Sequence, residues 1–308
     1  MTDGKNAAYC PINELKNVSV NQSIVFAVVA LAGIGAFSAI ILYFVARKFK
    51  VIEDPRIDIV ADMLPGANCG GCGFAGCRNF AENIVNAGNL EGMMCPPGGN
   101  RVMNQIAEAL GLVAEMKDPM IAVLRCNGSL AHAPGKVIYD GAANCAFAHQ
   151  LFIGSSGCPN GCLGLGDCVV SCSFDAMYMD SKTGLPVISE EKCVACGACV
   201  KACPRRIIEL RKVGPKGKRI YVNCINTEKG AIARKNCEVA CIGCGKCVRI
   251  CPYDAIEMEN NLAYISYEKC KFCRKCVEEC PTDAIVEINF PLRKPKTGSE
   301  KAESVPAQ

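Results

Sequence analysis

Cysteine is the residue type through which this chain can do chemistry. The sequence holds 25 cysteines in 308 residues, but only two histidines and no tryptophan. Cysteine at this density indicates either a disulfide scaffold or a set of metal centres. The two interpretations need different compartments, so the spacing of the cysteines and the location of the chain decide between them.

Two cysteine runs near the C-terminus, residues 241–252 and 270–281, each have the spacing C-x2-C-x2-C-x3-C-P. This spacing is typical of a two-cluster ferredoxin, in which three cysteines of a run bind one 4Fe-4S cluster and the fourth binds the other. It predicts one cluster on Cys241, Cys244, Cys247 and Cys280, and another on Cys270, Cys273, Cys276 and Cys251. A zinc site is the alternative, but it takes pairs of C-x2-C separated by a longer loop.

An earlier run, residues 193–204, is also complete and predicts a cluster on Cys193, Cys196, Cys199 and Cys172. Its partner cluster would use Cys162, Cys168 and Cys203. This set is one thiol short, because Leu165 stands where the later run has Cys244. Cys158 is the nearest substitute in the sequence.

An internal repeat relates these two regions. A shift of 79 residues without gaps superposes five pairs of cysteines, including Cys145 on Cys224 and Cys158 on Cys237. Five cysteines lie outside these sets and outside the four-cysteine group described next: Cys126, Cys145, Cys158, Cys224 and Cys237. One of them would complete the set that lacks a thiol and four would bind a further cluster, although spacing does not say which. We therefore expect five or six 4Fe-4S clusters and favour six.

A separate group of cysteines precedes these runs. Its spacing, C-x2-C-x4-C-x17-C, suits a single 4Fe-4S cluster held by Cys69, Cys72, Cys77 and Cys95. Structural zinc is the alternative for four cysteines alone. Two segments in this region, residues 78–88 and 100–111, have helical periodicity and end at glycine, so we expect short helices there.

An apolar run near the N-terminus indicates where the chain is located in the cell. Residues 24–46 contain no charge over 23 positions, enough to cross a hydrocarbon core of about 30 Å. Arg47, Lys48 and Lys50 follow directly, which predicts a single-pass helix in the cell (inner) membrane with the bulk of the chain in the cytoplasm. A cleaved signal peptide is the alternative, but its apolar part is shorter and follows basic residues. Cytoplasmic thiols stay reduced, so the cysteines should bind metal, whereas Cys10 would be a spare thiol outside.

These elements predict an α+β chain with one N-terminal transmembrane helix, a small single-cluster module and tandem two-cluster ferredoxin-like units. Short strands are expected at residues 135–140 and 218–223. The expected domains are a tail (1–23), the membrane helix (24–46), a linker (47–64), the single-cluster module (65–120), the first ferredoxin-like unit (121–210), the second (211–290) and a disordered tail (291–308).

The order of the membrane helix, "LPGANCGGCGFAGC" and "GCLGLGDC" before the ferredoxin runs resembles the B subunit of the Rnf complex, an ion-translocating ferredoxin:NAD oxidoreductase. The resemblance implies an enzyme subunit that takes electrons from reduced ferredoxin and relays them to membrane, flavin-bearing and NAD-reducing subunits, while the complex translocates sodium ions or protons. It implies no substrate catalysis by this chain. The ion used, the cluster potentials and the terminal acceptor are left open.

Other functions fit the same pattern. One is the electron-transfer subunit of a regulator-reducing, redox-sensing membrane complex that pumps no ion, and another is a membrane anchor for a soluble oxidoreductase. No G-x-G-x-x-G follows an expected strand, so we expect no bound NAD or dinucleotide flavin. The net charge of +4 with few aromatics also argues against nucleic acid. His132 and His149 lie in no paired Cys-His motif and are expected to be loop or packing residues.

Two basic segments are candidates for docking an acidic ferredoxin. The first comprises Arg205, Arg206, Arg211, Lys212, Lys216, Lys218 and Arg219, and the second Lys269, Lys271, Arg274 and Lys275. An ordinary charged surface is the alternative for both.

Overall fold

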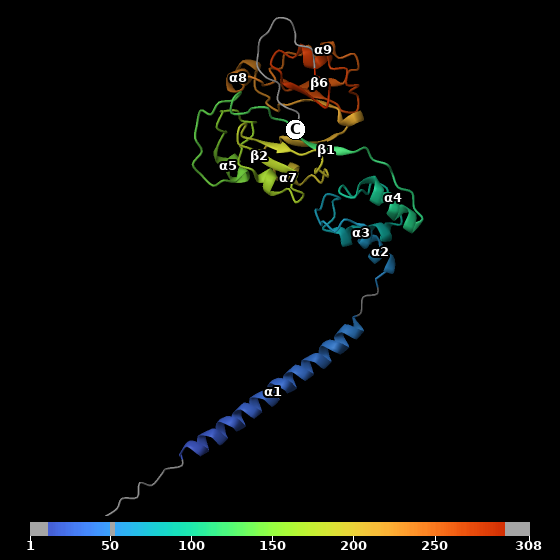
Figure 1. Ribbon diagram of the computed structural model, residues 1–308, viewed down its shortest axis with the longest axis vertical. Helices are drawn as coiled ribbons and strands as arrows, with labels where there is room; N and C mark the ends of the chain where they lie inside the picture. The colour runs from blue at the N-terminus through green and yellow to red at the C-terminus, as the bar shows by residue number, and fades with distance from the viewer. Residues whose placement is uncertain (1–11, 50–52, 293–308) are drawn as a thin grey trace, which may run out of the picture. The chain divides into compact units, whose positions relative to one another are not determined.

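The computed structural model describes residues 12–49 and 53–292, and the chain divides into two compact units at residues 54 and 55. The first unit holds one long helix, α1 (Ile12–Lys48), which begins well before the apolar run (Figure 1). From Ile24 to Lys48 its mean hydropathy is 2.6 and none of its side chains is buried. By length and composition this part of α1 can span a membrane. Cys10 and residues 293–308 lie outside the described residues.

The second unit begins with a small helical module. Its helices are α2 (Pro55–Met63), α3 (Cys77–Ala87) and α4 (Gly99–Leu110). Buried apolar side chains from all three, among them Ile57, Phe80 and Ile106, form its core. Both helices expected from the sequence are confirmed, and each ends at a left-handed glycine, Gly88 and Gly111.

Part of the expected linker is an ordered element. Residues 47–64 include α2, whose Ile57 and Val60 are buried in the core of the module. The amphipathic pattern "RIDIVADML" therefore packs one face of α2 against α3 and α4.

The rest of the second unit contains two halves with the same strand pairing. The first half has β1 (Met120–Leu124), α5 (Cys145–Leu151), α6 (Asp167–Val170), β2 (Met177–Asp180), β3 (Leu185–Ile188), α7 (Ala198–Ala202) and β4 (Ile208–Lys212). A 3-10 turn, η1 (Pro215–Gly217), leads to the second half, with β5 (Arg219–Val222), α8 (Gly230–Asn236), α9 (Lys246–Ile250), β6 (Ile256–Glu259), β7 (Leu262–Ile265), α10 (Lys275–Glu279) and β8 (Ile285–Ile288).

The strands of the described residues form four antiparallel pairs. In the first half β1 pairs with β4 and β2 with β3, and in the second half β5 pairs with β8 and β6 with β7. Each half therefore has an outer pair that joins its first and last strands and an inner hairpin. Figure 1 shows the first half in green to yellow and the second half beside it in orange to red.

One of the two expected strands is confirmed and the other is wrong. The segment 218–223 contains β5, whose residues are all buried. The segment 135–140 has no strand partner, because its backbone bonds instead to the loop carbonyl of Ser155. Ile138, in the middle of this segment, is 93% exposed, so its apolar residues have no sheet on which to pack.

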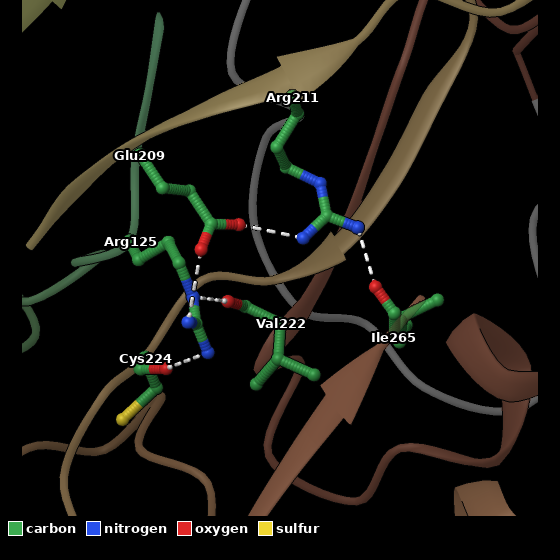
Figure 2. Close-up of polar contacts among 6 residues, drawn as sticks. All are labelled: Arg125, Glu209, Arg211, Val222, Cys224 and Ile265. Carbon is green, nitrogen blue, oxygen red and sulfur yellow. Dashed lines mark hydrogen bonds and ion pairs between the residues drawn. The ribbon is translucent and has the colours of Figure 1, made fainter. Parts of the chain in front are cut away.

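A half-buried arginine and a buried one hold the two halves together (Figure 2). Arg125, just after β1, pairs with Glu209 of β4 at 3.2 Å and donates to the carbonyl of Cys224 at 3.3 Å. Arg211, which is 2% exposed, pairs with Glu209 at 2.6 Å and donates to the carbonyl of Ile265 at 2.5 Å. The guanidinium of Arg211 also lies over the rings of Tyr221, Tyr264 and Tyr267. Two cations and one carboxylate are thus fixed at the contact between the halves.

Candidate metal centres

Four cavities are each lined by four thiols, and these sets are the ones expected from the cysteine spacing. We name each site by one member. The Cys244 site is lined by Cys241, Cys244, Cys247 and Cys280, and the Cys273 site by Cys251, Cys270, Cys273 and Cys276. The Cys196 site is lined by Cys172, Cys193, Cys196 and Cys199, and the module site by Cys69, Cys72, Cys77 and Cys95.

The loop of each run turns in the same way before its short helix. Its third and fifth residues have positive φ angles, as at Gly243 (65°) and Gly245 (69°). The turn brings the first three thiols together, and the helix then carries the fourth to the neighbouring cavity. In α9, for example, Cys247 lies within the helix and Cys251 at its C-terminal cap. The spacing C-x2-C-x2-C-x3-C thus distributes one run over two sites.

The loop around Leu165 keeps this turn without its thiol. Gly164 and Gly166 have φ angles of 72° and 84°, close to those of Gly243 and Gly245. Another segment brings a fourth thiol to this place: a fifth cavity, the Cys145 site, is lined by Cys145, Cys162, Cys168 and Cys203. The nearest cysteine in the sequence, Cys158, does not line this cavity.

Asp167 fixes Cys145 in place. The Asp167 carboxylate accepts the backbone N–H of Cys145 at 2.9 Å and that of Ala146 at 3.1 Å. Asn144 caps the same helix end by accepting the N–H of Phe147 at 2.8 Å. Asp167 opens α6 and immediately precedes Cys168, so one carboxylate ties the start of α5 to the deficient run.

The four remaining cysteines lie together between the halves. They form the shared site of Cys126, Cys158, Cys224 and Cys237, which are only 8 to 9% exposed. A Cβ placed on Gly128 would lie 3.6 Å from the sulfurs of both Cys126 and Cys237. The pKa of Cys237 is raised to about 11 by burial and by the neighbouring thiolates of Cys126 and Cys158.

Each half gives two equivalent thiols to the shared site. Cys126 follows β1 as Cys224 follows β5, and the two halves form the same backbone bonds. The N–H of Cys162 donates to the Cys126 sulfur at 3.4 Å, and the N–H of Cys241 donates to the Cys224 sulfur. The ungapped repeat pairs Cys145 with Cys224, but the strands show that Cys126 is the structural counterpart of Cys224.

Burial raises the pKa of several of these thiols, which opposes their ionisation. Burial is the largest cause of the raised pKa of Cys199, to about 12, and of Cys247, to about 11, and adjacent thiolates raise both further. Bound iron reverses this effect, since a coordinating metal deprotonates its thiols. Thiols crowded in this way therefore suit a cationic iron centre.

The spacing of these thiols also bears on the zinc alternative. Within residues 12–49 and 53–292, no three His, Cys, Asp or Glu side chains converge closely enough to hold one metal ion. Zinc needs its sulfur ligands about 2.3 Å from a single point, whereas each iron of a 4Fe-4S cluster takes its own thiolate at a separate corner. The C-x2-C-x2-C-x3-C runs have the spacing that such a cluster takes.

The Cys196 site and the Cys273 site differ in what covers them. A Cβ placed on Gly71 of the module would lie only 2.9 Å from the Cys196 carbonyl oxygen, so the module backbone approaches this site closely. The Cys69 thiolate also contributes to the raised pKa of Cys196. The corresponding thiol of the second half, Cys273, is exposed.

Only part of the first basic segment reaches the surface, where Arg206 and Lys216 are exposed. Arg205, Arg211 and Arg219 are 9%, 2% and 4% exposed, and Arg219 pairs with Glu190. Arg211 and Arg219 point into the interior from strands β4 and β5, a direction that a count of basic residues does not reveal. In the second segment Arg274 pairs with Glu287 at 2.6 Å, whereas Lys271 and Lys275 are exposed.

The histidines lie apart from the five thiol cavities. His132 has its Nδ1 3.9 Å from a carboxylate oxygen of Glu238, and His149 is exposed on α5. Asp167 and Arg125 were not among the expected site residues, and Arg205 was expected only on a docking surface. The position of Asp167 directly before Cys168 was a usable signal, but the roles of the two arginines depend on contacts across the fold.

Family models match three parts of the chain. A model for a 4Fe-4S dicluster domain matches residues 240–284, one for a 4Fe-4S binding domain matches residues 186–209, and one for a putative Fe-S cluster matches residues 64–97. These segments include the thiols of the module, Cys244 and Cys273 sites and part of the Cys196 site. The cysteines of the shared site and Cys145 lie outside all three.

Known proteins are similar over most of the chain. It is 44% identical to the B subunit of the Na(+)-translocating ferredoxin:NAD(+) oxidoreductase complex of Acetobacterium woodii, over 77% of this chain and 70% of that protein. It is 40% identical to the B subunit of the proton-translocating ferredoxin:NAD(+) oxidoreductase complex of Clostridium ljungdahlii, over 81% and 86%. It is also 40% identical to the B subunit of the ion-translocating oxidoreductase complex of Methanosarcina acetivorans, over 82% and 93%.

The thiol sites, the 4Fe-4S domains and these relatives agree with one another. They make the chain an iron-sulfur electron-transfer subunit of an oxidoreductase complex. The chain belongs to the family of B subunits of the Rnf complex, the ion-translocating ferredoxin:NAD oxidoreductase.

Proposed function

We propose that this chain is a membrane-anchored subunit that accepts electrons from reduced ferredoxin and passes them to membrane and flavin-bearing subunits of a complex that reduces NAD and translocates sodium ions or protons. The names of the relatives support the donor, the acceptor and the ion. The apolar span of α1 supports the anchor, and Arg47 and Lys48 at its end favour a cytoplasmic location for the bulk of the chain.

The two halves are tandem ferredoxin-like units, and six sets of four thiols hold six 4Fe-4S clusters in this proposal. The five cavity sites and the shared site together use all 24 described cysteines, four at each. A bound 4Fe-4S cluster supplies a one-electron couple whose potential depends on burial and on hydrogen bonds to sulfur. This grouping of the thiols is the observation that carries the proposal.

The protein groups around the sites set the conditions for electron transfer. Backbone N–H groups donate to the sulfurs of Cys126 and Cys224, and Asp167 fixes the position of Cys145. Burial of the shared-site thiols excludes water from the contact between the halves. No side chain of this chain needs to move a proton or a hydride for an electron to pass.

The exposed face around Cys273 is the place that we assign to ferredoxin. Lys271 and Lys275 are exposed on either side of Cys273, so they can attract an acidic partner to this thiol. The equivalent face around Cys196 is occupied by Gly71 of the module. Of these two equivalent cysteines, only Cys273 in the second half is therefore open to a soluble partner.

The test is the cofactor content and reactivity of the full chain, purified in detergent without oxygen. We expect about 24 irons and as many labile sulfides, four per cluster, with EPR signals of reduced 4Fe-4S clusters after addition of reduced ferredoxin. About 20 irons would contradict the shared site as a cluster site. A full complement that reduced ferredoxin fails to reduce would contradict the proposed donor.

A further inference from the structure

Arg205 is a buried cation next to two of the proposed cluster sites. It follows Cys203 and Pro204 in the chain and lines the cavity of the Cys145 site. Arg205 is only 9% exposed. Among the residues that the structure describes, no carboxylate forms an ion pair with it.

Four hydrogen bonds fix the guanidinium of Arg205. Its Nη1 donates to the carbonyls of Cys158 at 3.2 Å and Gly161 at 2.6 Å. Its Nη2 donates to the carbonyls of Phe152 at 3.1 Å and Ile153 at 2.6 Å. The same group therefore holds the segment that delivers Cys158 to the shared site and leads on to Cys162 of the Cys145 site.

One donor of this guanidinium is left over. The Nε of Arg205 is buried and has no hydrogen-bond partner among the described residues. A buried donor without an acceptor is costly, so an acceptor is expected at this position when the protein is complete. Burial lowers the pKa of Arg205, whereas the neighbouring thiolates of Cys158, Cys162, Cys126 and Cys203, from both sites, raise it.

We propose that Arg205 is a positioning residue shared by two clusters: its Nε–H donates to a sulfur of the cluster at the Cys145 site, and its fixed charge raises the reduction potentials at that site and at the shared site. This inference rests on the proposed function. Reduction adds one electron, supplied by ferredoxin, and increases the negative charge of the site. A neighbouring guanidinium stabilises this reduced form, and an arginine guanidinium is not deprotonated in proteins.

Redox titration of the full chain, monitored by EPR, tests the charge. Arg205→Met should decrease the reduction equilibrium constants of two of the clusters about tenfold, which is about 59 mV for a one-electron couple, and leave the others unchanged. Arg206→Met is the matched control, because Arg206 is adjacent but exposed, and it should shift none of them. An Arg205→Met variant with full iron content and unchanged potentials would overturn the proposal.

Pulsed EPR of the wild-type chain tests the hydrogen bond even if Arg205→Met loses a cluster. With arginine carrying nitrogen-15 in its guanidinium group, a reduced cluster should show a nitrogen-15 coupling that Arg205→Lys removes. Absence of this coupling in the wild type, or its persistence in Arg205→Lys, would overturn the proposal. A wild-type chain without cluster signals would instead contradict the proposed function, so the two failures are distinguishable.

Discussion

The two halves of the second compact unit line equivalent cavities with differently placed cysteines. In the second half Cys244 stands within its run, between two residues of positive φ. In the first half Leu165 occupies the same turn, and Cys145 reaches the cavity from a helix that precedes the run. The turn thus keeps its backbone conformation whether it carries a cysteine or a leucine. A cysteine from a distant segment, Cys145, lies at the cavity instead, and Asp167 holds its backbone there.

The shared site shows the opposite behaviour, because here the halves are equivalent. Cys126 and Cys224 each follow the first strand of their half and accept the same kind of backbone N–H bond. The two halves thus give equivalent cysteines to the shared site but use differently placed cysteines at the Cys145 and Cys244 sites. Variants at these cysteines can test both statements.

The largest effect is expected at the shared site. Cys126→Ser and Cys224→Ser should each remove about four irons, and the double variant should remove no more than either single one, since all three lose the same cluster. Iron and sulfide quantification measures this. A double variant that loses about eight irons would mean that the two thiols belong to different clusters. Cys10→Ser is the control and should retain the full iron content.

A second effect concerns the substitution of Cys145 for the thiol absent at Leu165. Cys145→Ser should lose up to about four irons, or alter the EPR signal of one cluster, because one iron corner loses its thiolate. The variant Cys145→Ser with Leu165→Cys should restore both, since the turn around Leu165 already has the backbone angles found beside Cys244.

Failure of Leu165→Cys to restore the cluster would show that the two turns are not interchangeable. A matched control is Cys145→Ser with Leu163→Cys, because Leu163 lies in the same loop at a position that carries no ligand in the second half. This control should not restore the cluster.

A smaller effect is expected where the module meets the first half. Gly71→Ala places a methyl group 2.9 Å from the Cys196 carbonyl oxygen, so the two segments must separate. The overpacking should lower the free energy of unfolding by about 1–3 kcal/mol, measured by thermal unfolding of the loaded protein. Freeze-quench EPR should also show slower electron transfer between the module and Cys196 sites.

Gly135→Ala is the control for this substitution, since its added methyl group would meet nothing closer than 3.9 Å. Equal stability and transfer rates in the two variants would show that the module and the Cys196 site are not in close contact in solution.

The smallest effect concerns the open face of the second half. Replacing Lys271 and Lys275 together by Glu should lower the rate constant for reduction by ferredoxin about tenfold at low salt, and the difference should vanish near 1 M salt, where the Debye length is about 3 Å. Stopped-flow spectroscopy measures this rate. Lys216→Glu, on the exposed turn after β4, is the control. Equal rates in both variants would place the docking surface elsewhere.

The cysteine spacing predicted much of the candidate site because the ferredoxin runs are local. The first three thiols of the Cys244 and Cys273 sites need only a short turn and a short helix, and the run spacing assigns each fourth thiol to the other run. Cys145 and Cys126 were harder to assign, because the segment 127–144 separates them and shifts the first half against an ungapped repeat. An alignment that began from the strands, "IAVLRC" against "RIYVNC", would have paired Cys126 with Cys224.

The basic residues show a different limit of sequence interpretation. Arg205, Arg211 and Arg219 lie close together in the sequence and suggested a basic surface, but all three are buried. A strand sends alternate residues to opposite faces. The partners that stabilise Arg211 are Glu209 in the first half, and Ile265 and three tyrosines in the second half. Composition gives the charge of such a segment, but it does not show whether the charged side chains face the solvent or the interior.

The shared site has a consequence for the biogenesis of the protein. Cys126 and Cys158 emerge early in synthesis, whereas Cys224 and Cys237 follow only after the first half is complete. Neither half can present four thiols there alone, so the sixth cluster that we propose can be inserted only after the halves have docked. Loading of this site would then act as a checkpoint that separates correctly assembled chains from those with one misfolded half.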